Sequence, residues 1–124
     1  MKAILFVDDN AVLARMTCEI LRRHGYRAEC VYNGCDALAR FESETFDLLV
    51  TDYRMDGMNG VELARLVRQK SPGIPVIIVT GYAPEQESEA VNVWLEKHEM
   101  FPALLEKIDF LLDEGNARQT LTKA

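Results

Sequence analysis

The stretch AILFVDDN, residues 3–10, combines an uninterrupted apolar run with two adjacent acids. Five apolar residues in succession are typical of a strand that is buried on both faces. The run stops at Asp8 and Asp9, whose carboxylates repel each other and resist transfer out of water. A buried strand that ends in paired acids therefore raises the question of what compensates their charge.

Strand and helix patterns alternate along the rest of the chain. After Asn10, which is a predicted helix N-cap, apolar residues recur at helical spacing up to Gly25. Further strands are expected over residues 26–32, 46–52, 75–80 and 91–96. Further helices are expected from residues 33–34, from residues 59–60 and over residues 104–112. Because the central strands are continuously apolar, the pattern predicts an α/β fold, a doubly wound parallel sheet with helices on both faces.

The composition is typical of one globular domain. The 124 residues are 48% apolar and 27% charged, and the net charge of −6 argues against nucleic-acid binding. No apolar run is long enough to cross a bilayer, and the start of the chain does not read as a signal peptide. We expect a cytoplasmic protein without membrane contact, in which Cys18, Cys30 and Cys35 stay reduced and act as small apolar side chains.

Functional groups of a doubly wound sheet gather at the carboxyl ends of its strands. This chain places five chemically active side chains there: Asp8, Asp9, Asp52, Thr80 and Lys97. Carboxylate oxygens can share a divalent cation such as Mg²⁺, whose charge turns their repulsion into binding energy. Beside such a cation a carboxylate can attack phosphorus, while cations and hydroxyl donors stabilise the phosphoryl oxygens. The pattern predicts a phosphoryl-transfer site.

Four motifs carry a resemblance to a known family. They are ILFVDDN (4–10), FDLLVTDYRMDGMNGVEL (46–63), IPVIIVTGYA (74–83) and EKHEMFPALLEKI (96–108). In combination they resemble the receiver domain of two-component response regulators, over residues 2–112. The resemblance implies a flavodoxin-like, five-stranded sheet of order 2-1-3-4-5, which is a known order of doubly wound folds. We expect residues 1–115 to form the receiver domain and residues 116–124 a polar tail or linker stub.

The resemblance also implies roles for the acids. Asp52 would be the phosphoacceptor. Asp8 and Asp9 would bind Mg²⁺ or Mn²⁺ together with Asp52 and the backbone carbonyl of Arg54. Taken alone, adjacent acids after a strand are often only favourable charges at a helix N-terminus, so the prediction rests on their combination with the other strand ends.

A further part of the resemblance concerns the phosphoryl group and the switch. Thr80 and Lys97 would contact the phosphoryl oxygens, and Thr80 and Trp94 would form the conformational switch. A lone Trp near a sheet edge is also commonly a partly buried core residue, and both interpretations of Trp94 stay open.

The family resemblance implies a signalling domain that accepts a phosphoryl group and is not an enzyme, although it assists its own phosphorylation and dephosphorylation. A sensor histidine kinase or a phosphotransfer protein would be the donor. The readout would be an output domain, a partner protein or a homodimer formed on phosphorylation. A degenerate receiver, which binds partners without being phosphorylated, is the alternative.

The chain departs from the family pattern in three places. His98 replaces the proline that usually follows the lysine, which could redirect the loop that aims Lys97, and Asp56 replaces a loop proline. Only seventeen positions separate Thr80 from Lys97, fewer than in the family by about one and a half helical turns. Because this segment is also polar, we expect helix 4 of the family, which lies between the fourth and fifth strands, to be shortened or missing. We also expect fast amide exchange over residues 83–91.

Two other classes of protein fit less well. A haloacid-dehalogenase phosphatase needs two acids separated by one residue after its first strand, together with a cap, whereas Asp8 and Asp9 are adjacent. A flavodoxin-like electron carrier needs a phosphate-binding loop rich in Ser, Thr and Gly, and the acids here would repel the phosphate.

Overall fold

The structure, a computed structural model, describes residues 1–81 and 88–113 and contains one five-stranded sheet. All strand pairs are parallel, and the order is β2-β1-β3-β4-β5. The strands are β1 (Ala3–Val7), β2 (Arg27–Val31), β3 (Leu48–Asp52), β4 (Val76–Thr80) and β5 (Val93–Glu96). The predicted fold class and strand order are confirmed.

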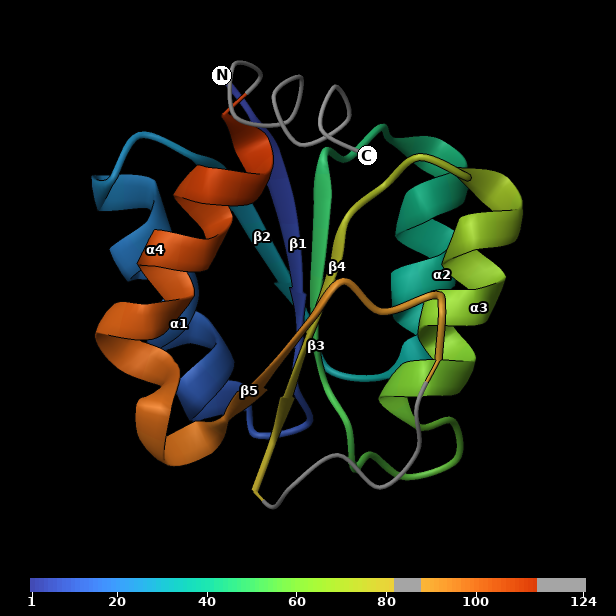
Figure 1. Cartoon of the computed structure of the whole chain (residues 1–124). Helices are drawn as coiled ribbons and strands as arrows, with labels where there is room; N and C mark the ends of the chain where they lie inside the picture. Colours follow the sequence, from blue (N-terminus) through green and yellow to red (C-terminus); the bar gives the residue numbers. More distant parts are fainter. Residues whose placement is uncertain (82–87, 114–124) are drawn as a thin grey trace.

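Four α-helices lie on the two faces of this sheet in the described part of the chain. They are α1 (Ala11–Arg23), α2 (Gly34–Ser43), α3 (Gly60–Lys70) and α4 (Met100–Leu112). Helices α1 and α4 cover one face, and α2 and α3 cover the other (Figure 1). Each residue of β1, β3 and β4 is buried, because these central strands are covered on both sides.

Between β4 and β5 the described residues 81 and 88–92 form no helix. This agrees with the expected shortening of the helix that receiver domains have between these two strands, which is not the helix labelled α4 here. Residues 82–87 lie outside the described residues, so most of the segment with predicted fast amide exchange, residues 83–91, is not described. Residues 90–92 are anchored instead by Arg68 of α3. Its Nε donates to the Ala90 carbonyl oxygen at 3.1 Å, and its Nη2 donates to Asn92 Oδ1 at 2.6 Å.

Strand β5 begins at Val93 rather than at the predicted residue 91. Asn92, directly before it, already contacts β4, because its Oδ1 accepts from the Val76 N–H at 2.8 Å and its own N–H donates to the Val76 carbonyl oxygen at 2.9 Å. At the other end, α4 spans Met100–Leu112 instead of starting at residue 104, and it follows a short 3-10 helix over Lys97–Glu99. Phe101 has non-helical backbone angles (φ −113°, ψ 130°), so the continuous helix begins after it. Both differences concern only element boundaries.

Asparagine caps begin the three helices that follow β1, β2 and β3. The Asn10, Asn33 and Asn59 side chains accept hydrogen bonds from the backbone N–H groups of Leu13, Asp36 and Glu62, at 3.1, 2.7 and 2.9 Å. Such caps satisfy N–H groups that the first helical turn leaves unpaired. The caps fix the starts of α1 and α2 shortly after β1 and β2, and the start of α3 at Gly60, after the loop that follows β3.

Candidate functional site

Three acids converge at the carboxyl ends of β1 and β3. One carboxylate oxygen from each of Asp8, Asp9 and Asp52 lies within 4.8 Å of the other two. Asp8 and Asp52 are only 2% and 4% exposed, whereas Asp9 is exposed. Carboxylates in this arrangement are donors suited to a hard divalent cation that keeps part of its water.

Local backbone contacts orient Asp8. Its N–H donates to the Val31 carbonyl oxygen at 3.2 Å, which extends the pairing of β1 with β2. Its Oδ1 accepts from the Asn10 N–H at 2.9 Å. Because Asn10 also caps α1, the Asp8 carboxylate and the start of this helix are held in one rigid unit.

Lys97 brings a positive charge to the acids. Its Nζ lies 3.2 Å from Asp52 Oδ2, with the Lys97 side chain 40% exposed and the Asp52 side chain 5% exposed. His98, which replaces the usual proline, is 73% exposed and lies 3.3 Å from Glu96 Oε2. The polar residue at position 98 therefore does not prevent Lys97 from reaching Asp52.

The acidic pocket is short of positive charge. Burial raises the pKa of Asp8, and although the Asn10 N–H and Lys97 lower it, the net direction is upward. Burial likewise raises the pKa of Asp52, the neighbouring Asp8 raises it further, and Lys97 only partly opposes this. The upward pKa shifts mean that Lys97 does not fully offset the burial of Asp8 and Asp52, so the donor set fits a divalent cation.

Gly60 lets α3 begin against the backbone at the end of β3. A Cβ at this position would lie 2.5 Å from the Asp52 carbonyl oxygen, and the Gly60 N–H donates to the Tyr53 carbonyl oxygen at 2.8 Å. This positioning residue was not singled out for the site from the sequence. The Asn59-Gly60 pair close behind Asp52 was the available signal, because glycine permits such a close approach.

A cavity of about 470 Å³ opens beside the acids. Its lining residues are Asp9, Tyr53, Arg54, Met55, Asp56 and Asn59. Arg54 thus lies in the loop that forms the cavity wall, next to the exposed acid of the pair. The cavity gives solvent and small ligands access to the outer side of the acidic pocket.

Thr80 ends β4 at the same edge of the sheet and is 1% exposed. In the strand register Asp52 pairs with Val79, and Thr80 pairs with Glu96. Thr80 therefore stands one position beyond the partner of Asp52 and beside the residue that precedes Lys97.

Trp94 lies on β5, half-buried against the aromatic ring of Tyr53. The two ring centroids are 5.7 Å apart and the ring planes are inclined by 54°. Tyr53 directly follows Asp52, so the Trp94 ring is linked to the end of β3 by one side chain. This packing fits a core role, and the switch role of Trp94 stays a prediction.

Comparisons with known proteins identify the family. A model of the response regulator receiver domain matches residues 4–106. The chain belongs to this family. It is therefore a signalling domain of the response regulators, and the family expected from the motifs is confirmed.

Curated relatives include single-domain and longer proteins. The chain is 34% identical to the chemotaxis protein CheY of Pseudomonas aeruginosa, covering 91% of this chain and 98% of that protein. It is 36% identical to the receiver protein CpdR of Brucella abortus, over 67% of this chain and 69% of that protein. It is 31% identical to the transcriptional regulatory protein ZraR of Klebsiella oxytoca, but spans only 28% of the length of ZraR.

Solved structures show the same fold. A CheY-like receiver domain from Methanospirillum hungatei is 33% identical with a TM-score of 0.86, covering 95% of this chain and 98% of that one. The response regulator TrrA of Thermotoga maritima, in complex with Mg²⁺ and BeF, is 34% identical with a TM-score of 0.83, covering 90% of this chain and 100% of that one. In the described part of the chain, no helix is long and apolar enough to span a membrane.

Proposed function

We propose that this chain is a phosphoacceptor domain that takes a phosphoryl group from the phosphohistidine of a histidine kinase, or of a phosphotransfer protein, onto Asp52. The observation that carries the proposal is the setting of Asp52. Its carboxylate is buried, belongs to a cluster of three acids and lies 3.2 Å from Lys97. A structural ion pair would not need the two further acids, whose presence raises the cost of burying Asp52.

Each residue has a distinct task in this proposal. An Asp52 carboxylate oxygen forms the new bond to phosphorus while the bond from phosphorus to the donor histidine breaks, which yields an acyl phosphate. Lys97 leaves its ion pair with Asp52 to contact a phosphoryl oxygen, and the Thr80 hydroxyl donates to another. Hydrolysis of the acyl phosphate returns the domain to its starting state.

Magnesium is the proposed cofactor, with Mn²⁺ as a substitute. Asp8, Asp9 and Asp52 would hold it, together with the backbone carbonyl of Arg54 in the adjoining loop. When bound, the cation supplies positive charge to the acids and to the phosphoryl oxygens. The complex of TrrA with Mg²⁺ and BeF supports this assignment through its similarity to the present chain.

The proposed donor and readout follow from the relatives. TrrA has also been solved in complex with the histidine kinase ThkA, and this TrrA structure is 33% identical to the present chain with a TM-score of 0.80. ZraR is a transcriptional regulatory protein. We propose that a sensor kinase of this kind phosphorylates the chain, and that an output domain, a partner protein or a second copy reads the phosphorylated state.

Labelling by a small phosphodonor tests the proposal. Radiolabelled acetyl phosphate in the presence of Mg²⁺ should label the wild-type chain, and Asp52→Asn should abolish the label while leaving the far-UV circular dichroism unchanged. Asp56→Asn is the matched control, since it removes an exposed acid of the same cavity and should keep the label. Equal labelling of wild type and Asp52→Asn would contradict the acceptor assignment. No labelling of a folded wild type that binds Mg²⁺ would favour the degenerate receiver.

A further inference from the structure

Strand β5, which directly precedes Lys97, is short and lies at the edge of the sheet beside β4. Of its four residues, Leu95 is buried and the others are half-buried. A slip of its pairing by one residue would move Lys97 by about 3.3 Å along the strand and exchange the two faces of β5. The contact of 3.2 Å between Lys97 Nζ and Asp52 Oδ2 therefore depends on the register of a short edge strand.

Arg68 of α3 binds the segment that leads into β5 with all three nitrogen atoms of its guanidinium. Nε donates to the Ala90 carbonyl oxygen at 3.1 Å, and Nη2 donates to Asn92 Oδ1 at 2.6 Å. Nη1 donates to the Pro72 carbonyl oxygen at 3.2 Å, in the turn after α3. Because the guanidinium is planar and its N–H donors have fixed directions, three acceptors held in this way are fixed in orientation as well as in distance. We call this set of hydrogen bonds the Arg68 anchor.

Asn92 connects the Arg68 anchor to the sheet. Its Oδ1, which accepts from Arg68, also accepts from the Val76 N–H at 2.8 Å, and its own N–H donates to the Val76 carbonyl oxygen at 2.9 Å. From the next residue on, the parallel register of β5 with β4 continues without interruption to Thr80, which pairs with the residue before Lys97. The Arg68 anchor thus holds the beginning of an extended run that ends at the active-site lysine.

The segment before β5 has little regular structure with which to hold itself. The described residues 88–92 form no helix. The Ala90 N–H donates to Ser88 Oγ at 3.1 Å, and Ala90 and Val91 pack against the apolar cluster beneath α2 and α3. Figure 1 shows this part of the chain turning beside α3 before it enters β5. Since local stability is low where backbone hydrogen bonds are few, a side chain from a rigid helix supplies the fixed point.

We propose that Arg68 is a positioning residue for phosphoryl transfer to Asp52. It fixes the start of β5 and thereby the register that aims Lys97 at the acceptor. The inference rests on the proposed function, because it concerns the lysine that would contact the phosphoryl group. Lys97 stabilises developing charge only at hydrogen-bond distance, so a displacement of this strand weakens its action while the acids at the ends of β1 and β3 stay in place.

The first test is the rate at which acetyl phosphate labels the full chain in Mg²⁺. Arg68→Ala should lower this rate about tenfold. Arg65→Ala is the matched control, since it removes an exposed arginine from the same helix and should label like wild type. Mg²⁺ affinity, measured by calorimetry, should be equal in all three proteins. In a Lys97→Ala background, Arg68→Ala should cause no further loss, because the residue through which it acts is gone.

Amide hydrogen exchange is the second test, and it does not depend on labelling. In Arg68→Ala the amides of residues 93–96 should exchange faster than in wild type, while those of β1 and β3 keep their rates. Arg68→Lys retains the charge and the stem without the planar fork. It should lie between wild type and Arg68→Ala in both tests, and it decides the question if Arg68→Ala does not fold.

The outcomes separate this proposal from the proposed function. A folded wild type that takes no label would contradict the proposed function, and the exchange rates would then decide by themselves whether Arg68 fixes β5. The positioning role is overturned if Arg68→Ala labels at the wild-type rate, or if exchange over residues 93–96 is unchanged. It is equally overturned if Arg68→Ala lowers labelling by the same factor with and without Lys97, because that result would indicate a general loss of structure.

Discussion

The acids at the two ends of the sheet have pKa values shifted in opposite directions. At the carboxyl ends of the strands, Asp8 and Asp52 are buried, and their pKa values are raised. Toward the amino ends, Glu44 lies between two arginines, and its pKa is lowered, first by the hydrogen bond from Arg40. Carboxylates at one end of the sheet are thus buried with too little positive charge beside them, whereas the Glu44 carboxylate at the other end is paired with arginines.

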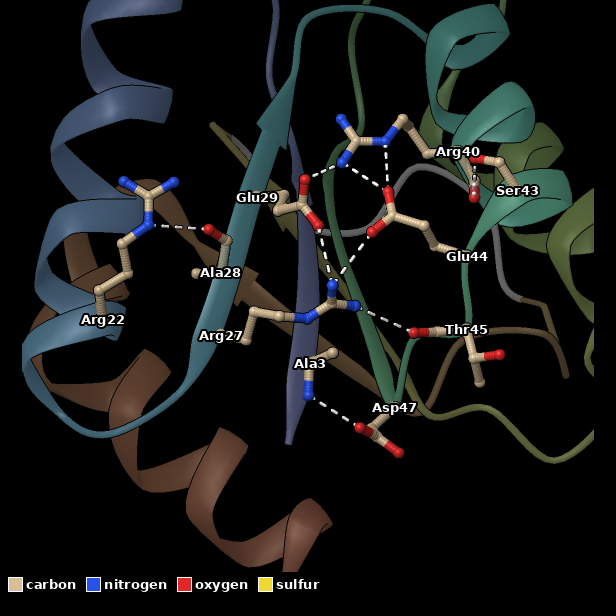
Figure 2. A network of polar contacts seen from close by, with 10 residues as sticks. All are labelled: Ala3, Arg22, Arg27, Ala28, Glu29, Arg40, Ser43, Glu44, Thr45 and Asp47. Carbon is tan, nitrogen blue, oxygen red and sulfur yellow. Dashed lines mark hydrogen bonds and ion pairs between the residues drawn. The ribbon is translucent and has the colours of Figure 1, made fainter. Parts of the chain in front are cut away.

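The paired end consists of four side chains that we call the edge network: Arg27, Glu29, Arg40 and Glu44. Arg27 and Arg40 each contact both glutamates, with distances to Glu44 of 3.0 and 2.7 Å (Figure 2). The Arg27 guanidinium also lies 5.4 Å from the centre of the Phe46 ring. Figure 2 shows these contacts joining β2 to the end of α2, so the acids here pair with arginines of the same fold.

This comparison shows how a site differs from a surface. Acids alone do not mark function, because each end of the sheet holds several. The distinguishing property is burial of acids beyond the charge that their neighbours supply, which natural proteins keep mainly where a ligand provides the remainder. The predictions below change one end or the other, from the largest expected effect to the smallest.

Gly60→Ala should have the largest effect on stability and should act at the site end. Alanine at the start of a helix would ordinarily be favourable by up to about 1 kcal/mol. Here its Cβ would lie 2.5 Å from the Asp52 carbonyl oxygen, and a backbone atom cannot rotate away. We expect a net loss of roughly 1–3 kcal/mol in the free energy of unfolding, measured by urea denaturation, together with slower labelling of Asp52.

Gly73→Ala provides the matched control for this substitution. A Cβ at Gly73 would meet nothing within 4 Å, so its free energy of unfolding should stay close to that of wild type. A stable Gly60→Ala variant with normal labelling would show that α3 can shift without disturbing β3.

The pH dependence of stability should reveal the acidic pocket. Because burial raises the folded-state pKa of Asp8 and Asp52 above 3.8, the folded state holds these protons more tightly than the unfolded state. In metal-free protein the free energy of unfolding contributed by these acids is therefore present at low pH and is lost as pH rises through their folded pKa values. Added Mg²⁺ should restore stability at neutral pH, as measured by thermal unfolding in chelator and in Mg²⁺.

Asp8→Asn separates the contribution of Asp8 to this pH dependence from that of Asp52. Its amide oxygen can still accept the Asn10 N–H, while the buried charge is gone. We expect the metal-free variant to be more stable than wild type at pH 7 by roughly 1 kcal/mol, and to gain less from Mg²⁺. The exposed Asp56→Asn should change neither quantity. A variant that is less stable than wild type at pH 7 would show that the Asp8 charge is already compensated within the chain.

Much of this arrangement could be predicted from the sequence, because it depends on local patterns. Apolar runs that end in acids fixed the strands, and the parallel fold then required their ends to meet, which explains why Asp8, Asp9 and Asp52 were expected together. The contact of Gly60 with the Asp52 carbonyl and the anchoring of Asn92 by Arg68 were not predicted. Both depend on how α3 packs against residues distant in sequence, and no local propensity encodes that packing.

The edge network should give the smallest effect. Arg40→Ala removes the ion pairs from Arg40 to Glu29 and Glu44, which are between about a quarter and a third exposed. Water and salt screen such pairs, so their net contribution to stability is small. We expect a loss in the free energy of unfolding below that of Gly60→Ala, which shrinks further in high salt. Lys70→Ala is the control, since Lys70 forms a single ion pair among the described residues, with Glu42 at 2.9 Å, and Glu42 is 66% exposed. Its loss should be smaller still. A large, salt-insensitive loss in Arg40→Ala would mean that the network acts through packing of the arginine stem, and that the two ends of the sheet differ in packing as well as in charge.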